Sequence, residues 1–379
     1  MSTQTVRTKN SLLVSVYAAL KKDAVFTLSL ILALISCFFS PPSISYIDFK
    51  VLICLFNLMI VIKAFDELHL LDKFAVSILN RCTDSRKVSL LLILLSFFAS
   101  MLITNDVALI TFVPLALIIG NKSGINMIDT VVLQTLAANI GSSLTPMGNP
   151  QNLFIFSYYK LAASHFFASV SLFPLLGLAW LVLLNRRNHS VRLSLNLDPV
   201  KVDDRIKTSV WAALFAAVVM SIFEVISYKA VFILILAATI IINKKLFSKV
   251  DYSLLITFVG FFVFIGNVSA VPLVSSYMKQ SLDSGIHTFF SSIALSQFIS
   301  NVPCSIFLSR FTPHWKELLL GVNIGGMGTL IASLASVISY KLFIKEDPHS
   351  GKAYLLRFSA YNLVSLCIFT IIIYFTLIR

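Results

Sequence analysis

The chain has 379 residues, of which 58% are hydrophobic and only 12% are charged. Soluble domains are about 45 to 50% apolar and about 25% charged, so this composition excludes a soluble globular protein and indicates an all-α polytopic membrane protein. The net charge of +13 lies mostly in short segments between apolar runs, which is typical of cytoplasmic loops rather than of a nucleic-acid-binding surface. The five cysteines lack the spacing of a disulfide framework or a metal site.

Apolar runs of about 17 to 25 residues predict the membrane-spanning helices. In the first half of the chain we expect spans at 24–40 and 49–66, a broken span at 128–159 and a span at 163–184. Residues 66–87 carry charges among spaced leucines. This pattern is typical of an amphipathic helix that lies in the membrane interface without crossing it.

Two apolar pairs, at 88–119 and 286–311, each surround a short polar tip. Each pair is either two full spans or a re-entrant hairpin whose tip lies at the membrane midplane. An acidic residue with no nearby Lys or Arg favours the hairpin, because a loop in water usually carries more polar residues. The tip residues are Thr104, Asn105 and Asp106 in the first pair, and Ser300, Asn301 and Val302 in the second.

The loop at 185–207 is the densest basic stretch of the chain, so the positive-inside rule assigns it to the cytoplasm. The same rule places the N-terminus in the cytoplasm. Five predicted spans follow the basic loop, and the second apolar pair returns to its own side, so we expect the C-terminus outside. After this loop the predicted spans are 208–226, 228–243, 250–268, a broken span at 315–344 and a last span at 358–378.

The two halves resemble each other. Residues 48–65 and residues 251–268 both begin with aspartate and have the same length. The two tips also occupy corresponding positions in the two halves. Because the second half starts on the opposite face from the first, we predict inverted repeats. The predicted units are a first inverted repeat at 24–184, a linking helix at 208–226 and a second inverted repeat at 228–378, all within one transmembrane domain at 1–379.

Two polar, glycine-containing stretches interrupt the broken spans. Residues 138–152 read ANIGSSLTPMGNPQN and residues 322–336 read VNIGGMGTLIASLAS. Aligned without a gap, they pair Asn139 with Asn323, Gly141 with Gly325 and Thr145 with Thr329. Irregular backbone at membrane depth persists only inside protein or beside a watery cavity, and paired interruptions of this kind point to the binding site of a transporter.

The ends of such half-helices predict the ligands. Helix N-termini suit anions, whereas C-terminal carbonyls and side-chain oxygens suit a small cation such as sodium. We expect glycine at the breaks because the backbone there leaves helical angles. The predicted cation-binding residues are Thr104, Asn105, Asp106, Asn139, Gly141, Ser300, Asn301, Asn323 and Gly325. The predicted substrate-binding residues are Asn105, Thr145, Gly148, Asn149, Asn301 and Thr329.

A structural alternative exists for Asn139 and Asn323. Polar residues in membrane bundles often hydrogen-bond across helices, with a gain of about 1 kcal/mol. Their repetition beside glycine in the same frame favours a binding site.

The segments TNDVALITFVPL, ANIGSSLTPMGNPQNL, SNVPCSIFL and GVNIGGMGTLIASLAS resemble the ion transporter superfamily. This superfamily includes divalent anion/sodium symporters for citrate, dicarboxylates and sulfate, arsenite permeases and some sodium/proton antiporters. The resemblance implies a homodimer with a fixed scaffold and an elevator-like transport domain. In the dicarboxylate branch each tip reads Ser-Asn-Thr. Asp106 and Val302 replace the two threonines here, which weakens the expectation of a di- or tricarboxylate.

We therefore expect a secondary active transporter in the cytoplasmic membrane. Its substrate would be a small anion, either a carboxylate or an inorganic oxyanion, coupled to sodium or protons, with no cofactor beyond sodium ions. The alternative is a sodium/proton antiporter or an arsenite or oxyanion exporter that uses Asp106 as the coupling acid. The sequence contains no nucleophile–base pair, phosphate loop or soluble catalytic domain, so we do not expect an enzyme.

Overall fold

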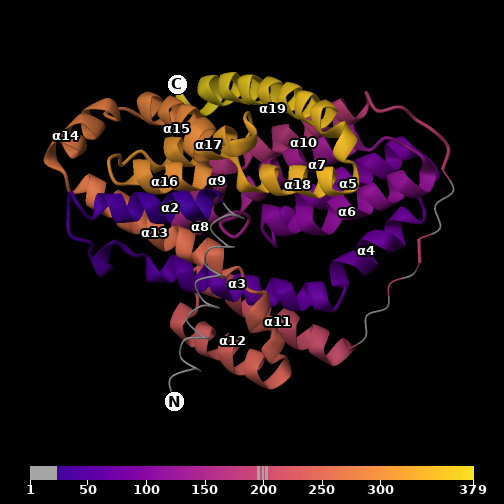
Figure 1. The fold of residues 1–379 in the computed structure, drawn as a ribbon, viewed down its shortest axis with the longest axis horizontal. Coiled ribbons are helices and arrows are strands. Elements are labelled where there is room, and N and C mark those ends of the chain that lie inside the picture. The colour runs from indigo at the N-terminus through magenta and orange to yellow at the C-terminus, as the bar shows by residue number, and fades with distance from the viewer. Residues whose placement is uncertain (1–23, 194–196, 199, 201–203) are drawn as a thin grey trace, which may run out of the picture.

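The computed structural model describes residues 24–193, 197–198, 200 and 204–379. Among them the regular elements are all helices, apart from an isolated β-bridge between Asp84 and Arg192. The N-terminus predicted to face the cytoplasm and part of the basic loop at 185–207 lie outside the described residues. Figure 1 shows many helices running roughly along the long axis of the molecule.

The helices of the first half follow the predicted apolar runs closely. They are α2 (Ala24–Ser36), α3 (Phe49–Glu67), α4 (Leu70–Leu79), α5 (Ser85–Ser100), α6 (Asn105–Ser123), α7 (Ile128–Gly141), α8 (Pro150–Tyr158), α9 (Ala163–Val170) and α10 (Leu172–Asn185). The first helix is shorter than predicted. It ends at Ser36, four residues before Ser40, and the chain then turns toward Pro41. The predicted interfacial helix at 66–87 is also wrong in extent, since only α4 and the ends of its neighbours fall there.

The second half repeats this order after α11. Its helices are α11 (Arg205–Ile222), α12 (Tyr228–Ile242), α13 (Tyr252–Ser269), α14 (Pro272–Ser281), α15 (Gly285–Ile299), α16 (Asn301–Ser309), α17 (Trp315–Gly325), α18 (Leu334–Glu346) and α19 (Gly351–Ile373). The shared aspartates have one structural role. Asp48 accepts a hydrogen bond from the N–H of Val51 and caps α3, and Asp251 accepts one from the N–H of Leu254 and caps α13, both at 3.1 Å.

Helix packing is reciprocal between the halves. α2 packs on α13 while α3 packs on α12, and α5 packs on α7 as α15 packs on α17. The halves also interlock, because α6 packs on α18 and α16 packs on α8. Figure 1 shows α11 and α12 together on one side of α3, away from the layer that holds α16 to α18.

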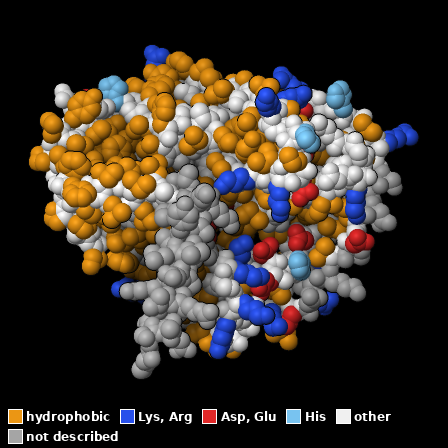
Figure 2. All heavy atoms as spheres, viewed as in Figure 1, with side chains coloured by type: hydrophobic (Ala, Val, Ile, Leu, Met, Phe, Trp, Pro, Cys, Tyr) orange, Lys and Arg blue, Asp and Glu red, His pale blue; other side chains and the backbone are white. Residues whose placement is uncertain are grey.

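Within the described residues, five helical segments are long and apolar enough to cross a membrane. They are Asn105–Ser123, Ala163–Asn185, Arg205–Ile222, Tyr252–Ser269 and Pro348–Ile378. The molecule has the surface of an integral membrane protein: Figure 2 shows charged side chains gathered toward one end of the long axis, while hydrophobic side chains cover the other end.

In α7 every residue except Asp129 is buried. A helix that is buried on all sides needs internal partners for its polar side chains. Gln134 donates to the carbonyl of Phe112 at 3.0 Å, and Thr135 donates to the hydroxyl of Ser339 at 2.6 Å. These bonds hold the end of α7, and with it Asn139, against elements of both halves.

Candidate functional site

The two predicted tips have the same unusual backbone conformation. Thr104, between α5 and α6, has φ 64° and ψ 147°, and Ser300, between α15 and α16, has φ 71° and ψ 153°. This region is nearly restricted to glycine, and it costs other residues about 1 to 3 kcal/mol. Such strain persists only where the surrounding structure holds the segment in place. The backbone of each tip is therefore held by its neighbours rather than being a loose loop.

Each tip is fastened to a break between two helices. We call residues 142–149, between α7 and α8, the first break, and residues 326–333, between α17 and α18, the second break. The Thr145 hydroxyl donates to the Met101 carbonyl at 2.5 Å, just before the first tip. The Thr329 hydroxyl donates to the Gln297 carbonyl at 2.9 Å, at the equivalent place before the second tip.

A further bond joins each tip to its own break. The backbone N–H of Asn105 donates to the carbonyl of Gly148 at 3.0 Å, and the Ser300 hydroxyl lies 3.4 Å from the carbonyl of Ala332. The gapless alignment pairs Gly148 with Ala332. The structure therefore brings each predicted tip to its predicted break in the same manner.

The paired asparagines reach across the molecule in opposite directions. Asn139, at the end of α7, donates to the hydroxyl of Ser336 at 3.2 Å and accepts from Ser333 at 3.0 Å, where the second break meets α18. It also accepts from the amide of Asn105 at 3.1 Å. The end of α7 is thus bonded to its own tip and to the opposite half.

Asn323, at the end of α17, makes the reciprocal connection. Its oxygen accepts from Asn149 at 3.1 Å, and its nitrogen donates to Asn152 at 2.7 Å. The alignment that pairs Asn139 with Asn323 also pairs Asn149 with Ser333 and Asn152 with Ser336. The two sets of bonds are therefore equivalent, and we call them together the crossed amide network.

We expected glycine at positions 141 and 325 because the backbone would leave helical angles there, and this prediction is wrong. Gly141 has helical angles, φ −60° and ψ −45°, and Gly325 is the last residue of α17. A Cβ atom on Gly141 would lie 2.2 Å from the Phe97 carbonyl oxygen, and one on Gly325 would lie 2.8 Å from Ser296. Both glycines therefore let two helices approach closely, and the left-handed backbone in the second break falls on Gly328, with φ 102°.

The remaining tip side chains are unbonded. Within the described chain the Thr104 hydroxyl, the Asp106 carboxylate and the Asn301 amide form no hydrogen bond or ion pair. Asn301 is only 4% exposed, and its amide lies against Gly326 at the second break. Asp106 is half-buried in the first turn of α6, where the helix dipole favours a negative charge. Asn301 is buried, whereas Thr104 and Asp106 are half-buried, and all three side chains keep hydrogen-bonding capacity for a ligand.

The sequence prediction omitted four residues that belong to this arrangement. Asn152, Ser333 and Ser336 complete the crossed amide network, and Gln297 fastens the second tip. Its side-chain nitrogen donates to the Gly325 carbonyl at 2.7 Å and its oxygen accepts from the N–H of Thr329 at 2.9 Å. The gapless alignment contained a signal for Asn152 and Ser336, because these polar residues end the two matched stretches.

Comparison with known proteins adds to this geometry. The profile of the citrate transporter family matches residues 12–311 of the chain. The chain belongs to the citrate transporter family. It is 33% identical over 318 residues to an uncharacterized transporter of Methanocaldococcus jannaschii, across 82% of this chain and 86% of that protein.

Two other similar proteins share less of their sequence with this chain. An inner membrane protein of Escherichia coli is 28% identical over 303 residues, across 78% of this chain and 80% of that protein. A transporter of Dictyostelium discoideum that bears the name arsB is 25% identical over 133 residues, across 35% of this chain and 24% of that protein. The protein is thus a transporter, and the prediction that it is not an enzyme is confirmed.

Proposed function

We propose that this citrate transporter family member is a secondary active transporter of a small anion, a carboxylate or an inorganic oxyanion, in the cytoplasmic membrane. The observation that carries the proposal is the buried, unbonded amide of Asn301 at the second tip, opposite an equivalent Asn105 at the first. A site between two helix-bounded tips offers N–H donors to an anion. The proposed substrate-binding residues are Asn105, Thr145, Gly148, Asn149, Asn301 and Thr329.

The hydrogen bonds divide these residues into two roles. The hydroxyl protons of Thr145 and Thr329 already bond backbone carbonyls, and the Asn149 amide lies in the crossed amide network. In this proposal they shape the site, and a ligand reaches chiefly the free tip groups. Breaking the existing bonds to bind substrate would leave buried acceptors unsatisfied.

We further propose coupling to sodium or protons. Importing one negative charge against 100 mV costs about 2.3 kcal/mol, and a dianion costs about 4.6 kcal/mol. The free oxygens of Thr104 and Asp106 beside Asn105 suit a cation; Asn139 contacts this tip through Asn105, and the carbonyl of Gly141 is the further ligand that we propose. The equivalent group in the second half consists of Ser300, Asn301, Asn323 and Gly325, where the Gly325 carbonyl is already held by Gln297.

The family resemblance and the reciprocal packing support two inverted repeats, re-entrant tips and elevator-like movement in a homodimer. α8 and α16 would move against α3 and α13. The contacts at this boundary are mainly apolar, such as Phe154 with Phe262, whose ring centroids lie 5.8 Å apart. Apolar contacts suit sliding because no directional bond has to break.

One observation favours the alternative, a sodium/proton antiporter or an arsenite or oxyanion exporter. Asp106 has no basic partner in the described chain, and an intramembrane carboxylate without one is a candidate proton carrier. The name of the arsB relative points the same way. In this alternative, flux would depend on pH and would be lost in Asp106→Asn.

The deciding experiment measures uptake of labelled citrate, smaller carboxylates, sulfate and arsenite into proteoliposomes, with and without a sodium gradient. We expect one anion to accumulate, and we expect Asn301→Ala and Asn105→Ala to abolish its uptake. Asn57→Leu, a buried asparagine of α3, is the matched control and should transport normally. Normal uptake in both tip variants would overturn the proposed site.

If no anion accumulates under any gradient, the symporter proposal fails. Sodium/proton exchange that is lost in Asp106→Asn would then establish the alternative. Folding of each variant is checked by a single symmetric peak in size-exclusion chromatography.

A further inference from the structure

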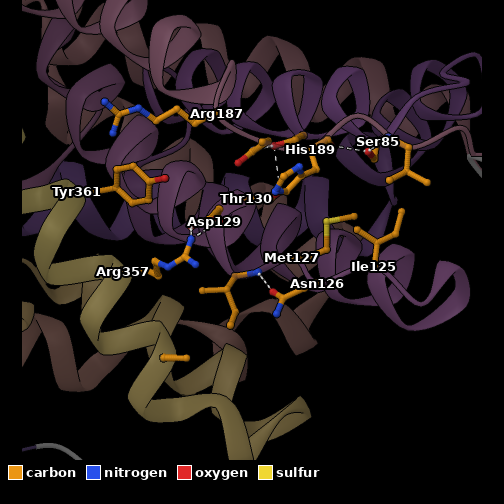
Figure 3. A pocket seen from close by; sticks show the side chains of 15 residues that line it. Ser85, Ile125, Asn126, Met127, Asp129, Thr130, Arg187, His189, Arg357 and Tyr361 are labelled. Carbon is orange, nitrogen blue, oxygen red and sulfur yellow. Dashed lines mark hydrogen bonds and ion pairs between the residues drawn. The ribbon is translucent and has the colours of Figure 1, made fainter.

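A cavity of about 710 Å³ lies apart from the tips, at the N-terminal ends of α5 and α7. Its remaining walls come from the loop before α7, the chain after α10 and the first three turns of α19. Figure 3 shows Arg357 and Tyr361 extending from α19 toward α7, with His189 across the cavity from them. None of these residues belongs to the proposed transport site.

The charges in this cavity favour an anion. Arg357 donates to both carboxylate oxygens of Asp129 at 2.7 Å, but it does so through Nη1 alone. The guanidinium also interacts with Tyr361, and the rest of its five N–H donors are available for a further acceptor. Arg187 also lines the cavity and forms no hydrogen bond or ion pair with any described residue. Two guanidinium groups and one carboxylate leave the cavity positive.

The neutral lining supplies additional hydrogen-bonding groups. Asn126 accepts from the N–H of Ile128 and so fixes the start of α7, whose first turn faces the cavity. Helix N-termini add a partial positive charge to such a place. Arginine forks match the geometry of phosphate oxygens better than a single ammonium group does.

The outer side of α19 suggests what carries the anion. Leu356, Leu363 and Val364 expose 73%, 47% and 50% of their surface in the turns next to Arg357. Apolar side chains exposed on a membrane-crossing helix face lipid tails. The cavity therefore combines a cationic pocket with an adjoining apolar surface, and basic pockets between transmembrane helices on the cytoplasmic side bind anionic lipid headgroups.

We infer that this cavity binds a phosphate group, carried by an anionic phospholipid of the cytoplasmic leaflet. Arg187 and Arg357 contact the phosphate, and the acyl chains lie along α19. Because α7 begins at this cavity and ends in the crossed amide network, an occupied cavity would also stabilise α7.

The test uses the full-length protein in detergent with added phosphatidylglycerol or phosphatidylcholine, and native mass spectrometry counts the retained lipids. We expect one phosphatidylglycerol to be retained in preference to phosphatidylcholine. Arg187→Gln and Arg357→Gln should weaken that retention about tenfold, the loss of one charge-assisted hydrogen bond. Arg81→Gln replaces an exposed arginine that does not line the cavity; it is the matched control and should bind as the parent does.

Arg357→Gln also removes the Asp129 ion pair, so Arg187→Gln provides the variant whose folding is not at issue. Inorganic phosphate is added as a separate arm. Displacement of the lipid by millimolar phosphate would identify a soluble phosphate as a second source of the ligand, and no displacement would identify the lipid alone. Equal retention by the parent and Arg187→Gln, or equal retention of both lipids, would overturn the inference.

Discussion

Asn323 shows how much a single side chain contributes to the site. Its oxygen and nitrogen both bond residues of the other half, and it is 2% exposed. Asn57 offers a comparison, because it is fully buried in α3 and neither atom of its amide has a hydrogen-bond partner among the described residues. The two asparagines are alike in burial and differ in bonding.

Replacement by leucine should therefore affect them differently. Asn323→Leu leaves the amides of Asn149 and Asn152 without their partner, which we expect to lower the free energy of unfolding by about 1 to 3 kcal/mol. Asn57→Leu removes an unsatisfied polar group and should be neutral or stabilising. Thermal unfolding in detergent measures both, and an equal loss in the two variants would contradict the assigned role of the crossed amide network.

At the scale of elements, the close approach of paired helices depends on Gly141 and Gly325. Gly141 lies where α7 packs on α5, and Gly325 lies where α17 packs on α15. Gly351 has helical angles too, but its nearest neighbours would be 3.5 Å from a Cβ atom, an ordinary contact distance.

Gly141→Ala should force α5 and α7 apart and destabilise the protein by about 1 to 3 kcal/mol, as overpacking usually does. Gly351→Ala should be neutral or slightly stabilising, because alanine favours the helix. Unfolding temperatures of the two variants, measured side by side, check this expectation. If Gly141→Ala is as stable as Gly351→Ala, the interface between α5 and α7 accommodates a methyl group without strain, and the prediction is wrong.

Helix positions were largely predictable from the sequence, and the site only in part. Polar residues between apolar runs identify the tips at Thr104 and Ser300, because lipid tolerates few interruptions. The crossing of Asn139 to Ser336 was not predictable, since a hydrogen bond between distant halves depends on how they pack. The role of Gly141 was misassigned for a similar reason: the sequence contains a glycine, but only the neighbouring helix reveals close packing.

At the scale of the whole molecule, α3 is held at both ends to the helices that follow the basic loop. Lys50 pairs with Glu224 after α11, and Glu67 pairs with Lys249 at 2.6 Å and accepts from Asn243. Exposed pairs of this kind add little stability, but two of them fix the orientation of α3. In the proposed elevator-like mechanism, α3, α11 and α12 would form the scaffold.

The proposed inverted repeats make a prediction about the two short helices that follow α3 and α13. Figure 1 places α4 and α14 at opposite ends of the long axis. Ser77 on α4 and Ser281 on α14 are both exposed. In a background where Cys37, Cys82 and Cys367 are serine, Ser281→Cys should react with a membrane-impermeant maleimide in intact cells. Ser77→Cys should react only after permeabilisation, because the basic loop near α4 belongs on the cytoplasmic side. Labelling of both from one side would mean that the halves share one orientation, and the reciprocal packing would then need a parallel arrangement.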